Sequence, residues 1–184
     1  MKRVFIIHGW EGNPNSNWQP WLKNELIKKG YEVVAPQMPN PNEPQCKDWV
    51  NSLNKLVGTP TSSDYFVGHS LAVIAILRYF EQLKIGQEVG GAVLVSGFPD
   101  SLGIEQHHGF FDGPVNWESV KSHCKNFVVL QSDNDPYVPM SHGKKLKENL
   151  GANLIIKHNA GHISKDAGFV ELPEALNAIL GFPI

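Results

Sequence analysis

A serine, two aspartates and a histidine in this chain have the types and the surroundings that acyl transfer requires. Ser70 lies in the pentapeptide Gly68-His69-Ser70-Leu71-Ala72, between an apolar run and an apolar helical stretch. Asp133 and Asp135 follow a later apolar run, and His162 follows the last one. Acyl transfer needs a nucleophile, a base that takes its proton and a carboxylate that orients the base. These four side chains can supply all three roles.

The pattern around Ser70 is typical of a tight turn between a strand and a helix. Such a turn holds the serine in a strained conformation, and small residues on both sides let the strand and helix approach each other. Gly68 and Ala72 are these small residues, and Ala72 departs from the G-x-S-x-G pattern by one methyl group. A serine that only caps the helix would explain the hydroxyl group but not the small residues on both flanks.

Six short apolar runs alternate with six segments of helical period, which predicts the elements that must position these side chains. The predicted strands are residues 4–7, 32–35, 65–67, 92–95, 127–130 and 154–156. The predicted helices are residues 18–26, 49–56, 73–80, 120–124, 146–150 and 172–180.

This alternation predicts an α/β fold, a three-layer α/β/α sandwich with a mostly parallel six-stranded sheet. Right-handed crossovers place helices on both faces, and ligands bind beyond the carboxyl ends of the strands. The candidate side chains follow strands at this edge: residues 8–12 after the first strand, Ser70 after the third, residues 132–139 after the fifth and residues 159–162 after the sixth. We therefore expect them to lie close together.

Length and composition suggest one domain over residues 1–184. The formal charge is −2 and no Lys/Arg run occurs, which argues against nucleic-acid binding. The apolar runs are too short to span a bilayer, and the chain enters its first strand directly after Lys2 and Arg3, so we expect a cytoplasmic protein without a membrane partner. Cys46 and Cys124 are expected to be ordinary reduced thiols, since a redox or zinc pair would be closely spaced.

The order Ser, Asp, His along the chain is the order found in α/β-hydrolases. The chain resembles that superfamily, and within it the small serine hydrolases that lack a large lid. The resemblance runs over essentially the whole chain and is most specific at Ile7-His8-Gly9, Met38-Pro39-Asn40-Pro41, Gly68-His69-Ser70-Leu71 and Val95-Ser96-Gly97-Phe98.

The resemblance implies a role for each candidate residue. Ser70 is then the nucleophile, His162 the base and Asp135 the orienting acid, with the backbone N–H groups of Trp10 and Leu71 forming an oxyanion hole. It also implies a trimmed α/β-hydrolase fold without a large cap, no cofactor and no metal. The expected activity is carboxylesterase-like hydrolysis of small ester, amide or thioester substrates.

Two of these assignments have alternatives within the sequence. Asp133 is the other candidate acid, and Asp135 is favoured because the turn Pro136-Tyr137-Val138-Pro139 follows it. His8 and His69 are candidate pocket residues, although His8 also fits a structural hydrogen-bonding role and His69 also fits packing around the turn.

The long irregular segment 97–115 has two interpretations. Loops of this length in a compact domain tend to be functional or mobile, so its side chains could form the rim of a substrate pocket. They could also pack inward and cover a sheet edge. The residues concerned are Phe98, His107, His108, Phe110 and Phe111. Metal binding by the adjacent histidines is disfavoured because no further ligands accompany them.

Two other function classes remain open. The chain could be an interaction protein that keeps the candidate residues only as a scaffold and binds another protein. It could also be a lyase or an acyltransferase, which would share the residues and differ in whether water reaches the acyl carbon.

The proline-rich segment 36–44 follows the second predicted strand. Its prolines indicate a rigid connection on the surface.

Overall fold

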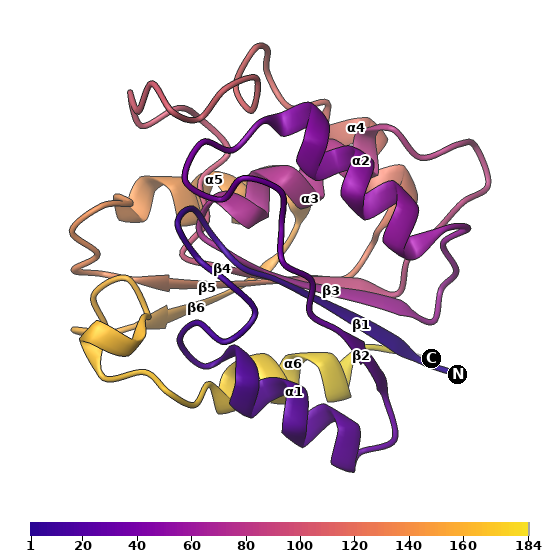
Figure 1. The fold of residues 1–184 in the computed structure, drawn as a ribbon, viewed down its shortest axis with the longest axis horizontal. Helices are drawn as coiled ribbons and strands as arrows, with labels where there is room; N and C mark the ends of the chain where they lie inside the picture. The colour runs from indigo at the N-terminus through magenta and orange to yellow at the C-terminus, as the bar shows by residue number, and fades with distance from the viewer. Residues whose placement is uncertain (184) are drawn as a thin grey trace.

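Six parallel strands form one sheet in the order β2-β1-β3-β4-β5-β6 in the computed structural model, which describes residues 1–183 (Figure 1). The strands are β1 (Arg3–Ile7), β2 (Glu32–Val34), β3 (Asp64–His69), β4 (Gly91–Val95), β5 (Phe127–Ser132) and β6 (Asn153–Lys157). All strand pairs in this sheet are parallel. The predicted α/β architecture is confirmed, and each predicted strand coincides with an observed one.

The helices alternate with the strands as predicted. They are α1 (Gln19–Lys28), α2 (Cys46–Val57), α3 (Leu71–Glu81), α4 (Trp117–His123), α5 (Met140–Leu150), α6 (Pro173–Gly181) and the short 3₁₀ helix η1 (Lys165–Ala167). One detail of the prediction is wrong: Cys124 directly follows α4 instead of lying within it. None of the helices within residues 1–183 has the length and apolar character needed to cross a membrane.

Helices cover both faces of the sheet and complete three layers. Helices α2, α3, α4 and α5 lie on one face, and α1 and α6 lie on the other (Figure 1). Two hydrophobic cores result. One is built around side chains such as Trp49, Phe66 and Phe80, and the other around Leu22 and Val67. Because β3, β4 and β5 lie between these cores, they are buried along their whole length, which explains their continuous apolar sequences.

Helix α3 is the most buried helix at the centre of the fold. Every residue from Leu71 to Leu77 is buried, so the usual amphipathic pattern is lost there. Its first residue follows Ser70 directly. The serine is therefore attached to a part of the molecule that can move little.

The strand order reverses between β1 and β3, which are neighbours in the sheet. The chain leaves β1 toward β2 on one side, whereas β3 is followed by β4 on the other side. At their carboxyl ends Ile7 pairs with Gly68, so the loops that follow the two strands start side by side and then diverge. In doubly wound folds this reversal creates the crevice in which ligands bind.

The segment 97–115 contains no α-helix or strand and connects β4 to α4. Its second half is anchored by Arg78 of α3, whose guanidinium donates to the carbonyl groups of Phe110, Gly113 and Pro114. The N–H of Cys46 also donates to the carbonyl of His108 at 3.0 Å. The part nearer β4 carries fewer such contacts and faces the sheet edge where the candidate residues collect.

Candidate active site

Ser70 occupies the strained turn that its sequence predicts. Its φ of 58° and ψ of −123° lie outside the usual regions for a residue with a side chain. A methyl group on Gly68 would lie 2.6 Å from Ile76 Cδ1 and 3.2 Å from the carbonyl carbon of Ala72. The strand and helix therefore approach each other too closely for a larger residue at Gly68, whereas the methyl group of Ala72 is accommodated.

The loop after β1 passes directly against the serine. A methyl group on Gly9 would lie 3.0 Å from Ser70 Cβ and 3.0 Å from the carbonyl oxygen of His69. A side chain at Gly9 would force its neighbours to shift by a few tenths of an ångström, and the close approach of this glycine brings the next residue, Trp10, to the wall of the same cleft as Ser70. Leu71 is the first residue of α3, so its N–H has no partner within the helix.

The His8 side chain stabilises this loop through hydrogen bonds. Its Nδ1–H donates to the carbonyl of Gly9 at 2.8 Å, and its Nε2 accepts from the N–H of Met38 at 2.9 Å. These partners fix the neutral tautomer with the proton on Nδ1, and burial lowers the pKa of His8. The Trp10 indole donates to the carbonyl of Asn42 at 3.1 Å. The proline-rich segment 36–44 thus holds the loop beside Ser70, a role that the sequence analysis missed.

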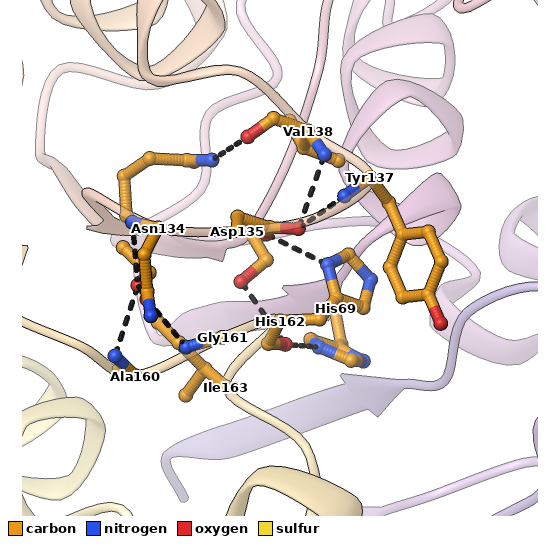
Figure 2. Close-up of polar contacts among 12 residues, drawn as sticks. His69, Asn134, Asp135, Tyr137, Val138, Ala160, Gly161, His162 and Ile163 are labelled. Carbon is orange, nitrogen blue, oxygen red and sulfur yellow. Dashed lines mark hydrogen bonds and ion pairs between the residues drawn. The ribbon is translucent and has the colours of Figure 1, made fainter.

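His162 and Asp135 form a buried pair at the ends of β6 and β5. The Nδ1–H of His162 donates to Asp135 Oδ2 at 2.8 Å, and the Asp135 side chain is fully buried. The other carboxylate oxygen accepts from the N–H groups of Tyr137 and Val138 at 2.9 and 3.1 Å (Figure 2). Both carboxylate oxygens of Asp135 therefore have hydrogen-bond partners within the protein, although the side chain is not exposed to water.

Asp133 pairs with a different histidine. Its carboxylate contacts His158 Nδ1 at 2.5 Å and accepts from the N–H of Asn159 at 2.9 Å. These two contacts, the backbone N–H first, lower the pKa of Asp133. Of the two candidate acids, the structure brings Asp135 to His162 and holds Asp133 in an exposed pair.

Ser70 and His162 line one cleft of about 640 Å³. Within residues 1–183 no hydrogen bond joins Ser70 Oγ to His162, and such bonds are often long in unliganded enzymes. The lining residues comprise an apolar set, called the apolar wall, and a polar set, called the polar wall. The apolar wall is formed by Trp10, Phe98, Leu102, Ile104, His107, Pro136, Tyr137 and Val138. The polar wall includes Glu11, Ser16, Asn17, Ser164 and Asp166.

Of the predicted pocket residues, His69 and Phe98 line this cleft, whereas His8, Phe110 and Phe111 do not. Phe110 is buried against Trp49, with ring centroids 5.7 Å apart, and Phe111 stacks on the outer side of Phe98 at 5.7 Å. Both interpretations of segment 97–115 therefore hold for different side chains, because its irregular backbone turns some inward and others toward the cleft.

His107, a candidate for the rim of the pocket, is a member of the apolar wall. Its ring is 7% exposed, and neither ring nitrogen has a hydrogen-bond partner in the described part of the chain. It packs edge-on against Trp10, with centroids 5.1 Å apart, and parallel to Phe98 at 5.8 Å. Burial, followed by the nearby His108, lowers the pKa of His107 to about 4. The imidazole is therefore neutral near neutral pH.

No group of three or more His, Cys, Asp or Glu side chains in residues 1–183 is arranged to hold a metal ion. Burial raises the pKa of Cys46 to about 11 and that of Cys124 to about 12. Both thiols are therefore protonated near neutral pH, and neither lines the cleft that contains Ser70.

A parallel sheet, a serine at a strained strand-to-helix turn and an Asp–His pair on two later loops define the α/β-hydrolase class of fold. The family model described as Serine hydrolase matches residues 4–180, and the chain belongs to this family. YdeN of Bacillus subtilis is 34% identical over 98% of this chain and 96% of YdeN. The serine hydrolase RBBP9 of Rattus norvegicus is 27% identical over 94% of this chain and 87% of RBBP9.

A solved structure agrees with these matches. The crystal structure of the ydeN gene product from B. subtilis superimposes with a TM-score of 0.93 and covers 98% of this chain and 97% of that chain. The expected resemblance to small serine hydrolases is confirmed.

Proposed function

We propose that this chain hydrolyses small esters, amides or thioesters through a triad of Ser70, His162 and Asp135. Membership of the Serine hydrolase family supports hydrolysis as the general reaction. The observation that carries the proposal is the contact of 2.8 Å between His162 Nδ1 and the buried Oδ2 of Asp135, at a cleft shared by His162 and Ser70. No other serine in this cleft lies at a strand-to-helix turn.

The proposed reaction has two acyl-transfer steps. His162 Nε2 takes the proton of Ser70 as Oγ forms a bond to the substrate carbonyl carbon. The negative charge on the carbonyl oxygen is stabilised by the N–H groups of Trp10 and Leu71. His162 then gives the proton to the leaving group, which departs as an alcohol, amine or thiol. Water, activated by His162, releases the acid from the acyl-enzyme.

Asp135 acts through His162. Its carboxylate accepts the Nδ1–H bond, which leaves the lone pair of a neutral imidazole on Nε2, the nitrogen that faces the hydroxyl in this mechanism. The carboxylate also stabilises the imidazolium that forms when the serine proton is transferred. The N–H groups of Tyr137 and Val138 hold the carboxylate in place.

The proposed substrates are small molecules. A cleft of about 640 Å³ has the size of a typical small-molecule site. Its apolar wall, which includes Leu102 and Ile104, suits an acyl or alcohol group of moderate size, and its polar wall, which includes Ser16 and Asn17, offers hydrogen-bonding groups. The fold within residues 1–183 includes no large cap that would enclose a long lipid chain.

Turnover of p-nitrophenyl acetate by purified protein tests this proposal. Ser70→Ala is expected to lower kcat by at least about 10⁴-fold, because the residues of a triad act as a unit. Ser141→Ala removes an exposed hydroxyl of α5 that does not line the cleft and is the matched control, with kcat expected to stay within about threefold of the wild-type value. Equal turnover by Ser70→Ala and wild type would contradict the proposal.

The products separate the remaining function classes. Release of free acid in water supports hydrolysis, whereas transfer of the acyl group to an added alcohol in preference to water would indicate an acyltransferase. Folded wild-type protein that turns over no ester, amide or thioester would favour the interaction protein.

A further inference from the structure

The turn that carries His162 is strained. Asn159, Gly161 and Ile163 all have positive φ angles, of 53°, 52° and 46°. A left-handed conformation is easy for glycine and tolerated by asparagine, but for a β-branched residue such as Ile163 it is a true outlier. Strained residues of this kind persist only where their surroundings hold them. The contacts around Ile163 should therefore show what holds this turn.

Three side-chain donors hold the carbonyl groups on either side of the Ile163 Cα. The carbonyl of His162 accepts from His69 Nε2 at 2.9 Å and from Ser96 Oγ at 3.2 Å. The carbonyl of Ile163 accepts from Trp18 Nε1 at 3.0 Å. Figure 2 shows the His69 ring directed at the main chain of His162. Both peptide groups that define the strained conformation are thus fixed from outside the turn.

The three donors are themselves well fixed. Trp18 and Ser96 are fully buried and His69 is 4% exposed. The rings of Trp18 and His69 pack edge to face, with centroids 5.8 Å apart. A carbonyl oxygen can only accept, so His69 carries its proton on Nε2. Burial, followed by the charge of His162, lowers the pKa of His69 to about 3, so this ring stays neutral during turnover.

Asp135 alone does not fix the position of the base. Its one hydrogen bond to the His162 ring is at Nδ1, and a single hydrogen bond leaves a ring free to pivot unless other groups pack against it, as the rings of Tyr137 and His69 do at centroid distances of 5.3 and 4.9 Å. The three donors instead fix the main chain from which the ring extends. Because an error of about 1 Å in the position of a catalytic group can cost about 10²-fold in rate, the two kinds of restraint together matter for catalysis.

We propose that His69, Ser96 and Trp18 form a carbonyl clamp that holds the strained turn at Ile163 and thereby keeps His162 aimed at Ser70. The clamp rests on the proposed function, since His162 is its base. His69 is a positioning residue in this arrangement, because it acts through His162: its Nε2 donates to the main chain of His162, and its ring packs against the His162 ring with centroids 4.9 Å apart. From the sequence, we expect His69 only to line the pocket or to pack around the turn.

Two substitutions of His69 separate the N–H donor from the ring. His69→Gln keeps an N–H group at nearly the position of Nε2, whereas His69→Phe keeps a flat ring without the donor. We expect His69→Phe to lower kcat by about 30-fold with KM changed less than about twofold, since positioning of the base affects the chemical step. His69→Gln should keep kcat within about threefold of wild type.

Ser96→Ala is the smallest change to the clamp and guards against a His69 variant that fails to fold. It removes one of two donors to the same carbonyl and should lower kcat by about threefold. Amide hydrogen exchange supplies a readout besides activity: residues 160–164 should exchange faster in His69→Phe than in His69→Gln, with α3 unchanged.

Equal impairment of His69→Gln and His69→Phe would overturn the clamp, because the ring and not the donor would then matter. Wild-type kcat in His69→Phe and Ser96→Ala would overturn it as well. If wild-type protein itself turns over no ester, the proposed hydrolase function fails instead. The clamp is then judged by hydrogen exchange, and unchanged exchange at residues 160–164 in His69→Phe overturns it.

Discussion

Two Asp–His pairs lie at the carboxyl edge of the sheet, and both are built from the loops that follow β5 and β6. His162 contacts Asp135 at 2.8 Å and His158 contacts Asp133 at 2.5 Å, in each case through Nδ1. The side chains of the first pair are 14% and 0% exposed, whereas those of the second are 78% and 38% exposed. The two pairs thus have the same residue types and nearly the same contact distance, but they differ in how far their side chains are exposed to water.

The comparison shows which features make an Asp–His pair useful for catalysis. Water screens the charge of Asp133, and an exposed pair of this kind contributes little. The carboxylate of Asp135 lies out of water and is oriented by the N–H groups of Tyr137 and Val138. An oriented charge in a dry site stabilises a neighbouring imidazolium without reorganisation of solvent. We therefore expect the two pairs to respond very differently to the same substitutions.

The largest difference is expected between the two histidines. His162→Gln should lower kcat for p-nitrophenyl acetate by about 10⁴-fold or more, because no base would remain beside Ser70. His158→Gln removes the exposed partner and should leave kcat within about twofold. Steady-state kinetics of the two variants checks this. Comparable losses in both would show that burial does not separate the pairs.

The two aspartates should differ in the same sense. Asp135→Asn is expected to lower kcat by about 10³- to 10⁴-fold, because an amide oriented by the same N–H groups no longer fixes the tautomer of His162 or stabilises its charge. Asp133→Asn should change kcat less than about twofold. The kcat values of both variants are measured at the same pH on folded protein. A larger loss in Asp133→Asn would assign the acid to Asp133.

The free energy of unfolding in acid should depend on His69, which is buried beside His162. The folded-state pKa of His69, about 3, lies below its ordinary value of 6.5, so between these values the unfolded chain binds more protons than the folded one. This contribution is present above about pH 6.5 and is lost as the pH falls toward 3. Urea unfolding of His69→Gln should therefore show a shallower loss of stability over this range than wild type. Identical pH profiles would contradict a buried, neutral His69.

The smallest effect is expected at the exposed pair. The folded-state pKa of Asp133 lies below its ordinary value of 3.8, so its stabilising contribution is present above that value and is lost as the pH falls through the lowered pKa. Asp133→Asn should have a slightly lower Tm than wild type near pH 6, and the difference should vanish in acid and shrink in high salt. A difference that persists at high salt would indicate a buried role.

The order of strands and helices could be predicted because apolar periodicity records which face of an element is buried. The turn at Ser70 was equally readable, since the small residue at Gly68 is favoured by the close approach of the strand to the backbone of Ala72 and the side chain of Ile76. The Ser, Asp, His order identified residues that the fold brings to one cleft edge.

The pocket wall could not be predicted in the same way. Phe110 points into the core and Leu102 into the cleft, and both belong to an irregular segment in which no periodicity relates position to direction. Nor does periodicity describe contacts between distant loops, such as the donation from Met38 to His8 or from Trp18 to Ile163. These contacts arise from tertiary packing. The sequence did offer one signal for the pocket wall, because Tyr137 lies two residues after the candidate acid Asp135.

Labelling with a fluorophosphonate probe tests the central claim most directly, because the probe reacts only with an activated serine hydroxyl. Purified wild-type protein, Ser70→Ala and His162→Gln would be labelled, digested and mapped by mass spectrometry. The account predicts one labelled peptide, modified at Ser70, in wild type and little or no labelling in either variant. Labelling at another serine, or undiminished labelling of Ser70 in His162→Gln, would contradict a site in which the buried pair of Asp135 and His162 activates Ser70.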